Sequence, residues 1–85
     1  MKISVILPTY NRANILDLTI RNILNQSYLE FELIIINDAS KDNTLNIIKK
    51  YLSKDTRVKL INNYNNLGCA KSREIGLAAA SSEYI

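Results

Sequence analysis

Three short polar segments carry the residue types that could bind a ligand. The first is PTYNR (8–12), the second is NDAS (37–40), and the third is NNLGCAKSR (65–73). An aromatic ring such as Tyr10 can stack on a flat base, and a carboxylate such as Asp38 can accept hydrogen bonds from a base or a ribose. Cations close to the start of a helix favour a bound diphosphate. The chemistry that these segments suggest is nucleotide binding.

Several of these residues also have a purely structural interpretation. Asp38 or Ser40 could cap the helix expected after them. Pro8 and Asn11 favour a chain reversal, and Asn66 could cap the third helix. These interpretations compete with ligand binding, and the sequence leaves both open.

The charged and aromatic residues are harder to explain by structure alone. Tyr10 could close the core instead of stacking on a base. Arg12 next to a helix start is unfavourable for the helix dipole, so a phosphate or carboxylate partner would compensate for it. Lys71 and Arg73 fall in the first turns of the third helix, where they could bind a diphosphate or pair with nearby glutamates.

Alternating apolar patterns predict the elements that position these segments. Short β-branched runs predict strands, and apolar residues at helical spacing predict helices. The helical faces predicted to be buried include Ile15 on the first helix and Leu52 on the second. A last segment, EYI, begins another strand. The predicted elements are strand 2–7, helix 14–26, strand 31–37, helix 42–52, strand 57–62, helix 69–81 and strand 83–85.

This alternation predicts a single α/β domain over residues 1–85, with a Rossmann-like three-layer αβα architecture and a parallel sheet. The second strand is apolar at nearly every position, as expected for a strand buried on both faces. Ligands of open parallel sheets bind outside the carboxyl ends of the strands. All three polar segments follow strands, so we expect them to meet at that edge.

Composition excludes several other classes of protein. The chain has no histidine and one cysteine, Cys69, so zinc ligand sets, a Ser-His-Asp triad and an internal disulfide are excluded, which fits a reducing cytoplasm. Neither G-x-G-x-x-G nor a P-loop is present. The net charge of +3 is mild and spread along the chain, which argues against nucleic-acid binding. No stretch is long enough to span a bilayer.

Four segments in order, VILPTYNR, FELIIINDASKDNT, NLGCAKSREIGL and SSEYI, resemble the opening of an inverting family 2 glycosyltransferase with a GT-A fold. The resemblance implies a site for a nucleotide-diphosphate sugar, with a UDP-sugar as the family-weighted choice. Two departures are mild: this chain has Asn37 and Ala39 where such enzymes often have aspartate and glycine. A third departure, Glu74 where asparagine is common, weakens the resemblance of the third segment. The nucleotide-binding residues that we predict are Pro8, Thr9, Tyr10, Arg12, Asp38, Gly68, Lys71 and Arg73.

The resemblance also implies functional groups that the 85 residues do not contain. In such enzymes the segment that begins as EYI leads to a D-x-D motif, which binds Mg²⁺ or Mn²⁺, and the catalytic base follows later. We therefore expect no catalytic or metal residue before Ile85. We expect the chain to be a truncated nucleotide-binding half, inactive alone, of an enzyme working in the cytoplasm or at the cytoplasmic face of a membrane.

The expected partners are the nucleotide sugar, a saccharide or lipid-linked acceptor of surface polysaccharide synthesis, and a second copy of the chain. Truncation would expose the edge of the first strand, and an apolar edge invites pairing. Two alternatives are a non-catalytic nucleotide-binding or interaction module and a flavodoxin-like regulatory domain with Asp38 as phosphoacceptor. The second needs an acidic pair after the first strand, which LPTYN does not offer.

Overall fold

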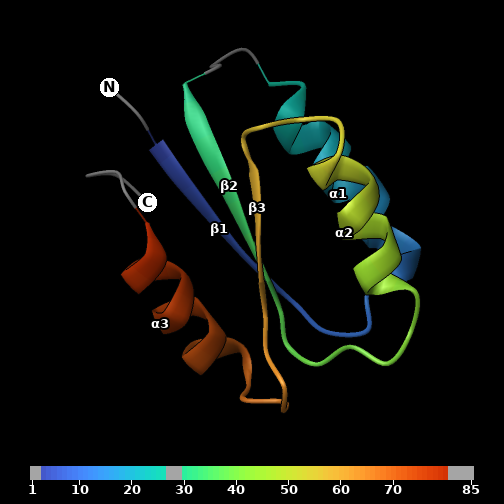
Figure 1. Ribbon diagram of the computed structural model, residues 1–85, viewed down its shortest axis with the longest axis vertical. Coiled ribbons are helices and arrows are strands. Elements are labelled where there is room, and N and C mark those ends of the chain that lie inside the picture. Colours follow the sequence, from blue (N-terminus) through green and yellow to red (C-terminus); the bar gives the residue numbers. More distant parts are fainter. Residues whose placement is uncertain (1–2, 27–29, 81–85) are drawn as a thin grey trace.

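The computed structural model describes residues 3–26 and 30–80, which form the predicted βαβαβα order (Figure 1). The predicted strand at 83–85 lies outside the described residues. The first strand runs further than predicted and includes Pro8 and Thr9, so the turn predicted at Pro8 is wrong. The elements are β1 Ile3–Thr9, α1 Ala13–Leu24, β2 Phe31–Asn37, α2 Thr44–Leu52, β3 Val58–Asn62 and α3 Cys69–Ala79.

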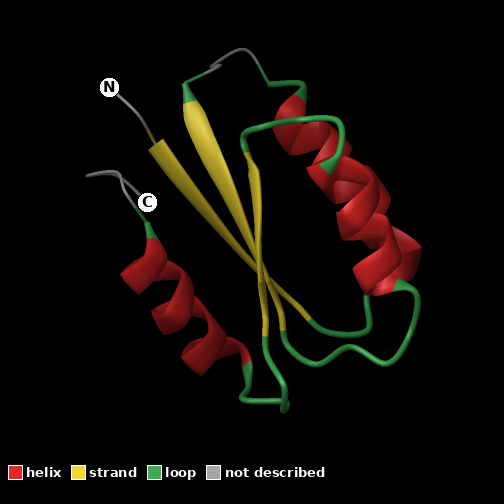
Figure 2. Ribbon diagram, in the orientation of Figure 1, coloured by secondary structure: helices red, strands yellow, loops and turns green. Residues whose placement is uncertain are grey.

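The three strands form one parallel sheet in the order β1-β2-β3. Figure 2 shows α1 and α2 on one face of this sheet and α3 on the other. All seven residues of the central strand β2 are buried, because both of its faces are covered. The predicted three-layer architecture is therefore confirmed, and the carboxyl ends of all three strands lie at one edge.

The main apolar core lies between the sheet and the α1–α2 pair. Leu16 and Ile20, one turn apart on α1, pack with Ile48 of α2 against alternate residues of the strands. Two core predictions are wrong, because Ile15 and Leu52 are 49% and 36% exposed. Helical geometry turns Ile15 about 100° away from Leu16, out of the stripe that faces the sheet.

The opposite face is built differently, because α3 lies close against the sheet through small residues. Its buried residues are Ser72 and Gly76. A Cβ atom on Gly76 would lie 2.6 Å from Cγ2 of Ile6 and 2.7 Å from Cδ1 of Ile36. The absence of a side chain at Gly76 therefore sets how closely α3 approaches β1 and β2.

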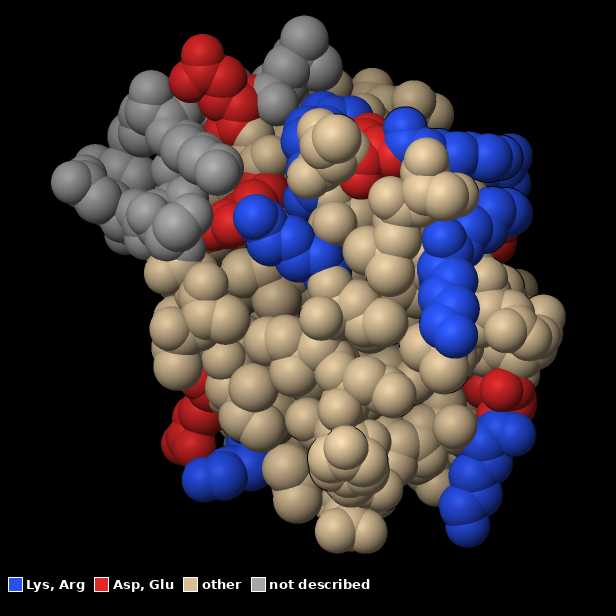
Figure 3. All heavy atoms as spheres, viewed as in Figure 1, with Lys and Arg blue, Asp and Glu red and all other residues tan. Residues whose placement is uncertain are grey.

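The charged side chains on the face shown in Figure 3 lie in separate groups across its upper part and at its two lower corners, several of them next to side chains of opposite sign. The centre of this face is uncharged. Among the residues that the structure describes, no helix is both long enough and apolar enough to cross a membrane.

Candidate functional site

The three polar segments meet at the carboxyl end of the sheet, as predicted. The Asp38 amide donates a 2.9 Å hydrogen bond to the Thr9 carbonyl, which joins the ends of β2 and β1. The Asn63 amide donates one of 2.9 Å to the Asn37 carbonyl, which joins the ends of β3 and β2. The polar residues after each strand are therefore held side by side by backbone bonding.

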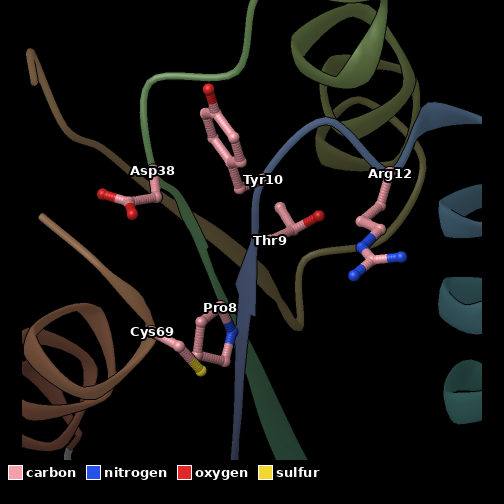
Figure 4. A pocket seen from close by; sticks show the side chains of 6 residues that line it. All are labelled: Pro8, Thr9, Tyr10, Arg12, Asp38 and Cys69. Atoms are coloured by element: carbon pink, nitrogen blue, oxygen red, sulfur yellow. The ribbon is translucent and has the colours of Figure 1, made fainter. Parts of the chain in front are cut away.

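A cavity of about 210 Å³ opens at this edge (Figure 4). Asp38 and Arg12 lie on opposite sides of the end of β1, and Cys69 of α3 lies beside Pro8. Five of the eight predicted binding residues line the cavity, together with a cysteine that we did not predict. The lining residues are Pro8, Thr9, Tyr10, Arg12, Asp38 and Cys69.

Asp38 is the most constrained residue of the site. Its side chain is buried, with 3% exposed. Oδ1 accepts hydrogen bonds from the Leu67 amide at 2.8 Å and the Asn63 side-chain amide at 2.9 Å, and Oδ2 accepts one from the Gly68 amide at 2.9 Å. Burial favours a higher pKa, but these donors outweigh it and hold the pKa of Asp38 below its ordinary 3.8. The residue is therefore ionised at neutral pH, and it does not cap α2.

The turn after β1 is held by side-chain bonds to the segment after β2. Asn11 has a φ of 50°, which confirms its predicted turn role. Its side-chain Oδ1 accepts a 2.8 Å hydrogen bond from the Lys41 backbone N–H, and its backbone N–H donates one of 3.0 Å to Oγ of Ser40. The predicted capping role of Ser40 is therefore wrong, because its oxygen is used here. Helix α2 begins after Asn43 instead.

Tyr10 and Arg12 are exposed at the cavity, whereas Thr9 lines it with a buried hydroxyl. Tyr10 is 42% exposed, so it does not close the core. Thr9 is 6% exposed, and within the described part of the chain its buried Oγ1 has no hydrogen-bond partner. The guanidinium of Arg12 is exposed and makes no ion pair with any described residue. A second cavity of about 200 Å³, between β1 and α1, shares Thr9 and Arg12 with the first.

The third segment places its glycine at the start of α3. Gly68 is the N-cap residue, with a φ of 90° that a side chain would rarely adopt. The predicted capping role of Asn66 is therefore wrong. The Asn66 side chain instead donates a 3.4 Å bond to the Asp38 carbonyl. Gly68 thus contacts the site through the hydrogen bond that its backbone N–H donates to Asp38, and it does not line the cavity.

The two predicted cations of α3 lie at the periphery. Lys71 Nζ is 3.7 Å from the Glu74 carboxylate, which is one of the alternatives that the sequence left open. Arg73 Nη2 lies 3.7 Å from the Cys69 sulfur. Both cations are exposed, and neither lines the cavity.

The sequence did not predict two residues of the site, Cys69 and Asn63. Cys69 lines the cavity because it is the first residue of α3, directly after Gly68. Its position after a glycine turn was a signal that we did not use. Asn63 binds Asp38, but it is one of four asparagines in residues 62–66, and nothing in the sequence distinguishes which amide turns inward.

The described residues do not form a metal site. No three side chains of the usual ligand types come together in residues 3–26 and 30–80. Asp38, the carboxylate in the cavity, already accepts three hydrogen bonds from the third segment.

Comparison with known proteins defines the class. Residues 4–85 match the family model of Glycosyl transferase family 2, and the chain belongs to this family. A glycosyltransferase of Haemophilus influenzae is 46% identical over 83 residues, which cover 98% of this chain. TuaG of Bacillus subtilis, a glycosyltransferase named for teichuronic acid biosynthesis, is 34% identical over 98% of this chain. The chain spans 33% of the length of each relative.

Solved structures of similar proteins carry the same fold. Residues 1–349 of TarS from S. aureus, in complex with UDP-GlcNAc, superpose with a TM-score of 0.88 and 35% identity, covering 98% of this chain and 24% of that one. The mannosyltransferase PcManGT from Pyrobaculum calidifontis, in complex with GDP-Man and Mn²⁺, gives a TM-score of 0.85 and 25% identity, covering 93% and 24%. The α/β arrangement described above is therefore shared with these two structures.

Proposed function

We propose that this chain is the donor-binding part of a glycosyltransferase that moves a sugar from a nucleotide-diphosphate sugar to an acceptor hydroxyl with inversion. The observation that carries the proposal is the cavity at the carboxyl end of the sheet, where Tyr10 and Asp38 come together. Membership of the family supports it. UDP is the nucleotide that we favour, because the TarS structure at 35% identity contains UDP-GlcNAc.

In this proposal Tyr10 and Asp38 receive the base. The partly exposed ring of Tyr10 offers a stacking surface at the mouth of the cavity. A carboxylate has about four acceptor positions, and three of those on Asp38 are occupied by protein donors. One position on Oδ2 is left for a base N–H. The backbone of Pro8 and the free hydroxyl of Thr9 would face the ribose.

The diphosphate would lie between the start of α3 and Arg12. Among the residues that the structure describes, no side chain caps the N-terminus of α3, which leaves its first amides to bind an anion. Gly68 lets the backbone approach closely there, and Lys71 and Arg73 add positive charge. Arg12, unpaired within the described residues, would supply a cation from the other side of the cavity.

We propose that the catalytic base and the carboxylates that bind Mg²⁺ or Mn²⁺ lie outside residues 1–85, so that these residues alone do not catalyse transfer. Such a cation would offset charge on the departing diphosphate, and PcManGT was solved with Mn²⁺. The proposed acceptor is a saccharide or a lipid-linked saccharide that is extended in the cytoplasm. A role in surface polysaccharide synthesis is supported by the name of TuaG, which refers to teichuronic acid biosynthesis.

We also propose that the chain self-associates through β1. Within the described residues β1 pairs only with β2, so its other edge has no neighbouring strand, and its side chains Val5, Ile6 and Leu7 are only half buried. Unpaired strand edges are templates for pairing with a second chain. Sedimentation at increasing protein concentration should show a dimer, and a monomer at every concentration would contradict this proposal.

Titration calorimetry with UDP and Mn²⁺ tests the proposed site. Wild-type protein should bind UDP more tightly than GDP, and Asp38→Ala and Tyr10→Ala should each weaken UDP binding about tenfold, the loss typical of one charge-assisted hydrogen bond or one stacked base. Tyr64→Ala is the matched control, because Tyr64 is fully exposed and does not line the cavity. Equal UDP affinities for wild type and Asp38→Ala would remove Asp38 from the site.

A further inference from the structure

We propose that Asp38 is a positioning residue as well as a base contact: its carboxylate clamps the loop after β3 so that the start of α3 is aimed at the diphosphate. We call Asp38, Asn63, Leu67 and Gly68 the Asp38 clamp. The inference rests on the proposed function for its ligand. It adds that base recognition and phosphate binding are linked through one buried carboxylate.

The geometry of the clamp is unusual for a residue that only contacts a ligand. Two consecutive amides, those of Leu67 and Gly68, converge on the two oxygens of one carboxylate at 2.8 and 2.9 Å. Converging backbone amides form an anion-binding concavity, and here the anion is supplied by the protein itself. Hydrogen bonds to a charged acceptor are stronger than neutral ones. With 3% of Asp38 exposed, solvent does not compete for them.

The loop needs this carboxylate because little else holds it. Residues 63–68 contain no helix or strand. Tyr64 is fully exposed and Leu67 is 46% exposed, so burial of apolar side chains does not fix the loop. Its contacts with Asp38 come from the Asn63 side chain, the Asn66 side chain and the two amides of Leu67 and Gly68. The conformation of the loop therefore depends on Asp38.

The clamp continues directly into the first turn of α3. Gly68 donates its amide to Asp38, and its carbonyl accepts the Ser72 amide at 3.0 Å, the first hydrogen bond of the helix. The Asn63 side-chain amide lies 2.9 Å from Asp38 and also 3.2 Å from Oγ of the fully buried Ser72. Loss of the clamp should therefore free the amides and cations at the helix start while leaving β2 in place.

The experiment separates the base from the phosphates by titrating uridine and UDP, followed by NMR chemical shifts so that weak binding is measurable. Asn63→Ala removes one arm of the clamp without touching the cavity lining. It should weaken UDP binding about tenfold and leave uridine binding unchanged. Asn65→Ala is the matched control, since Asn65 is an exposed residue of the same loop whose side chain makes no hydrogen bond to the described residues.

Either of two results with Asn63→Ala would overturn the inference: an equal loss of affinity for uridine and UDP, or no loss of affinity for either ligand. Asp38→Asn should weaken both ligands, with the greater loss for UDP. If wild-type protein binds neither ligand, the proposed function itself fails. Circular dichroism must first show that the variants are folded.

Amide hydrogen exchange tests the clamp without any ligand. In wild-type protein the Leu67 and Gly68 amides should exchange far more slowly than the Asn65 amide of the same loop, and Asp38→Asn should remove this protection. Exchange of Leu67 and Gly68 at the rate of Asn65 in wild-type protein would show that the clamp does not form, whatever the outcome of the titrations.

Discussion

The two faces of the sheet are held by different physical means. On the face covered by α1 and α2, large apolar side chains such as Ile20, Ile35 and Ile48 interdigitate and are fully buried. On the face covered by α3, the helix lies against β1 and β2 through Gly76 and Ser72, and its first turn is joined to the sheet by the Asp38 clamp.

This difference shows where the stability lies and where the site lies. Close packing of apolar volume gives the α1–α2 face its stability and tolerates little loss of side chain. The α3 face also buries apolar side chains of the sheet, Ile34 and Ile36, but the helix itself buries only small residues, and its start depends on hydrogen bonds to a buried charge. Helix α3 is therefore positioned by its close approach to the sheet at Gly76 and by hydrogen bonds to Asp38. Substitutions that change these contacts should displace it, whereas loss of apolar volume should affect the α1–α2 face.

The largest expected effect is on the α1–α2 face. Ile35→Ala should lower the free energy of unfolding by about 3–4 kcal/mol, because it removes a fully buried side chain and leaves a cavity. Ile35→Val should cost about 1 kcal/mol. Urea denaturation measures both, with Leu18→Ala as the control, since Leu18 is 56% exposed and should change stability by less than about 0.5 kcal/mol. A loss below about 1 kcal/mol for Ile35→Ala would contradict this account of the core.

Gly76→Ala tests the α3 face, where two effects predict opposite signs. Helix propensity alone favours alanine over glycine by about 1 kcal/mol. The new Cβ, however, would lie 2.6 Å from Ile6 and 2.7 Å from Ile36, and such overpacking costs about 1–3 kcal/mol. We expect a net loss of up to about 2 kcal/mol in urea denaturation, and weaker UDP binding because the start of α3 moves. A gain in stability would show that α3 is not held by close approach.

The same contrast explains what could be predicted from the sequence. The β-branched runs and the helical spacing of Leu16 and Ile20 predicted the sheet, the α1–α2 face and the convergence of the three polar segments, because periodicity records burial directly. The spacing failed at Ile15 and Leu52, which are apolar without being buried.

At the site, residue type and position after a strand predicted five of the residues that line the cavity. The partners of each side chain could not be predicted, because they depend on loop conformations that hydrophobic patterns do not encode. Residue type alone allows Ser40 and Asn66 to be helix caps, whereas the folded loops use them to bind Asn11 and Asp38. Asn63 was overlooked for the same reason.

The smallest expected effect concerns Ala39, which follows Asp38 and has a φ of 61°. The left-handed conformation costs a non-glycine residue about 1–2 kcal/mol, while glycine loses about 0.5–1 kcal/mol more entropy on folding. Ala39→Gly should therefore stabilise the protein by about 0.5 kcal/mol in urea denaturation. The matched control is Ala78→Gly in α3, an exposed helical position where the same substitution should cost about 1 kcal/mol. Losses of equal size at both positions would show that the turn after β2 is not strained, and that the segment presenting Asp38 relaxes around a side chain at position 39.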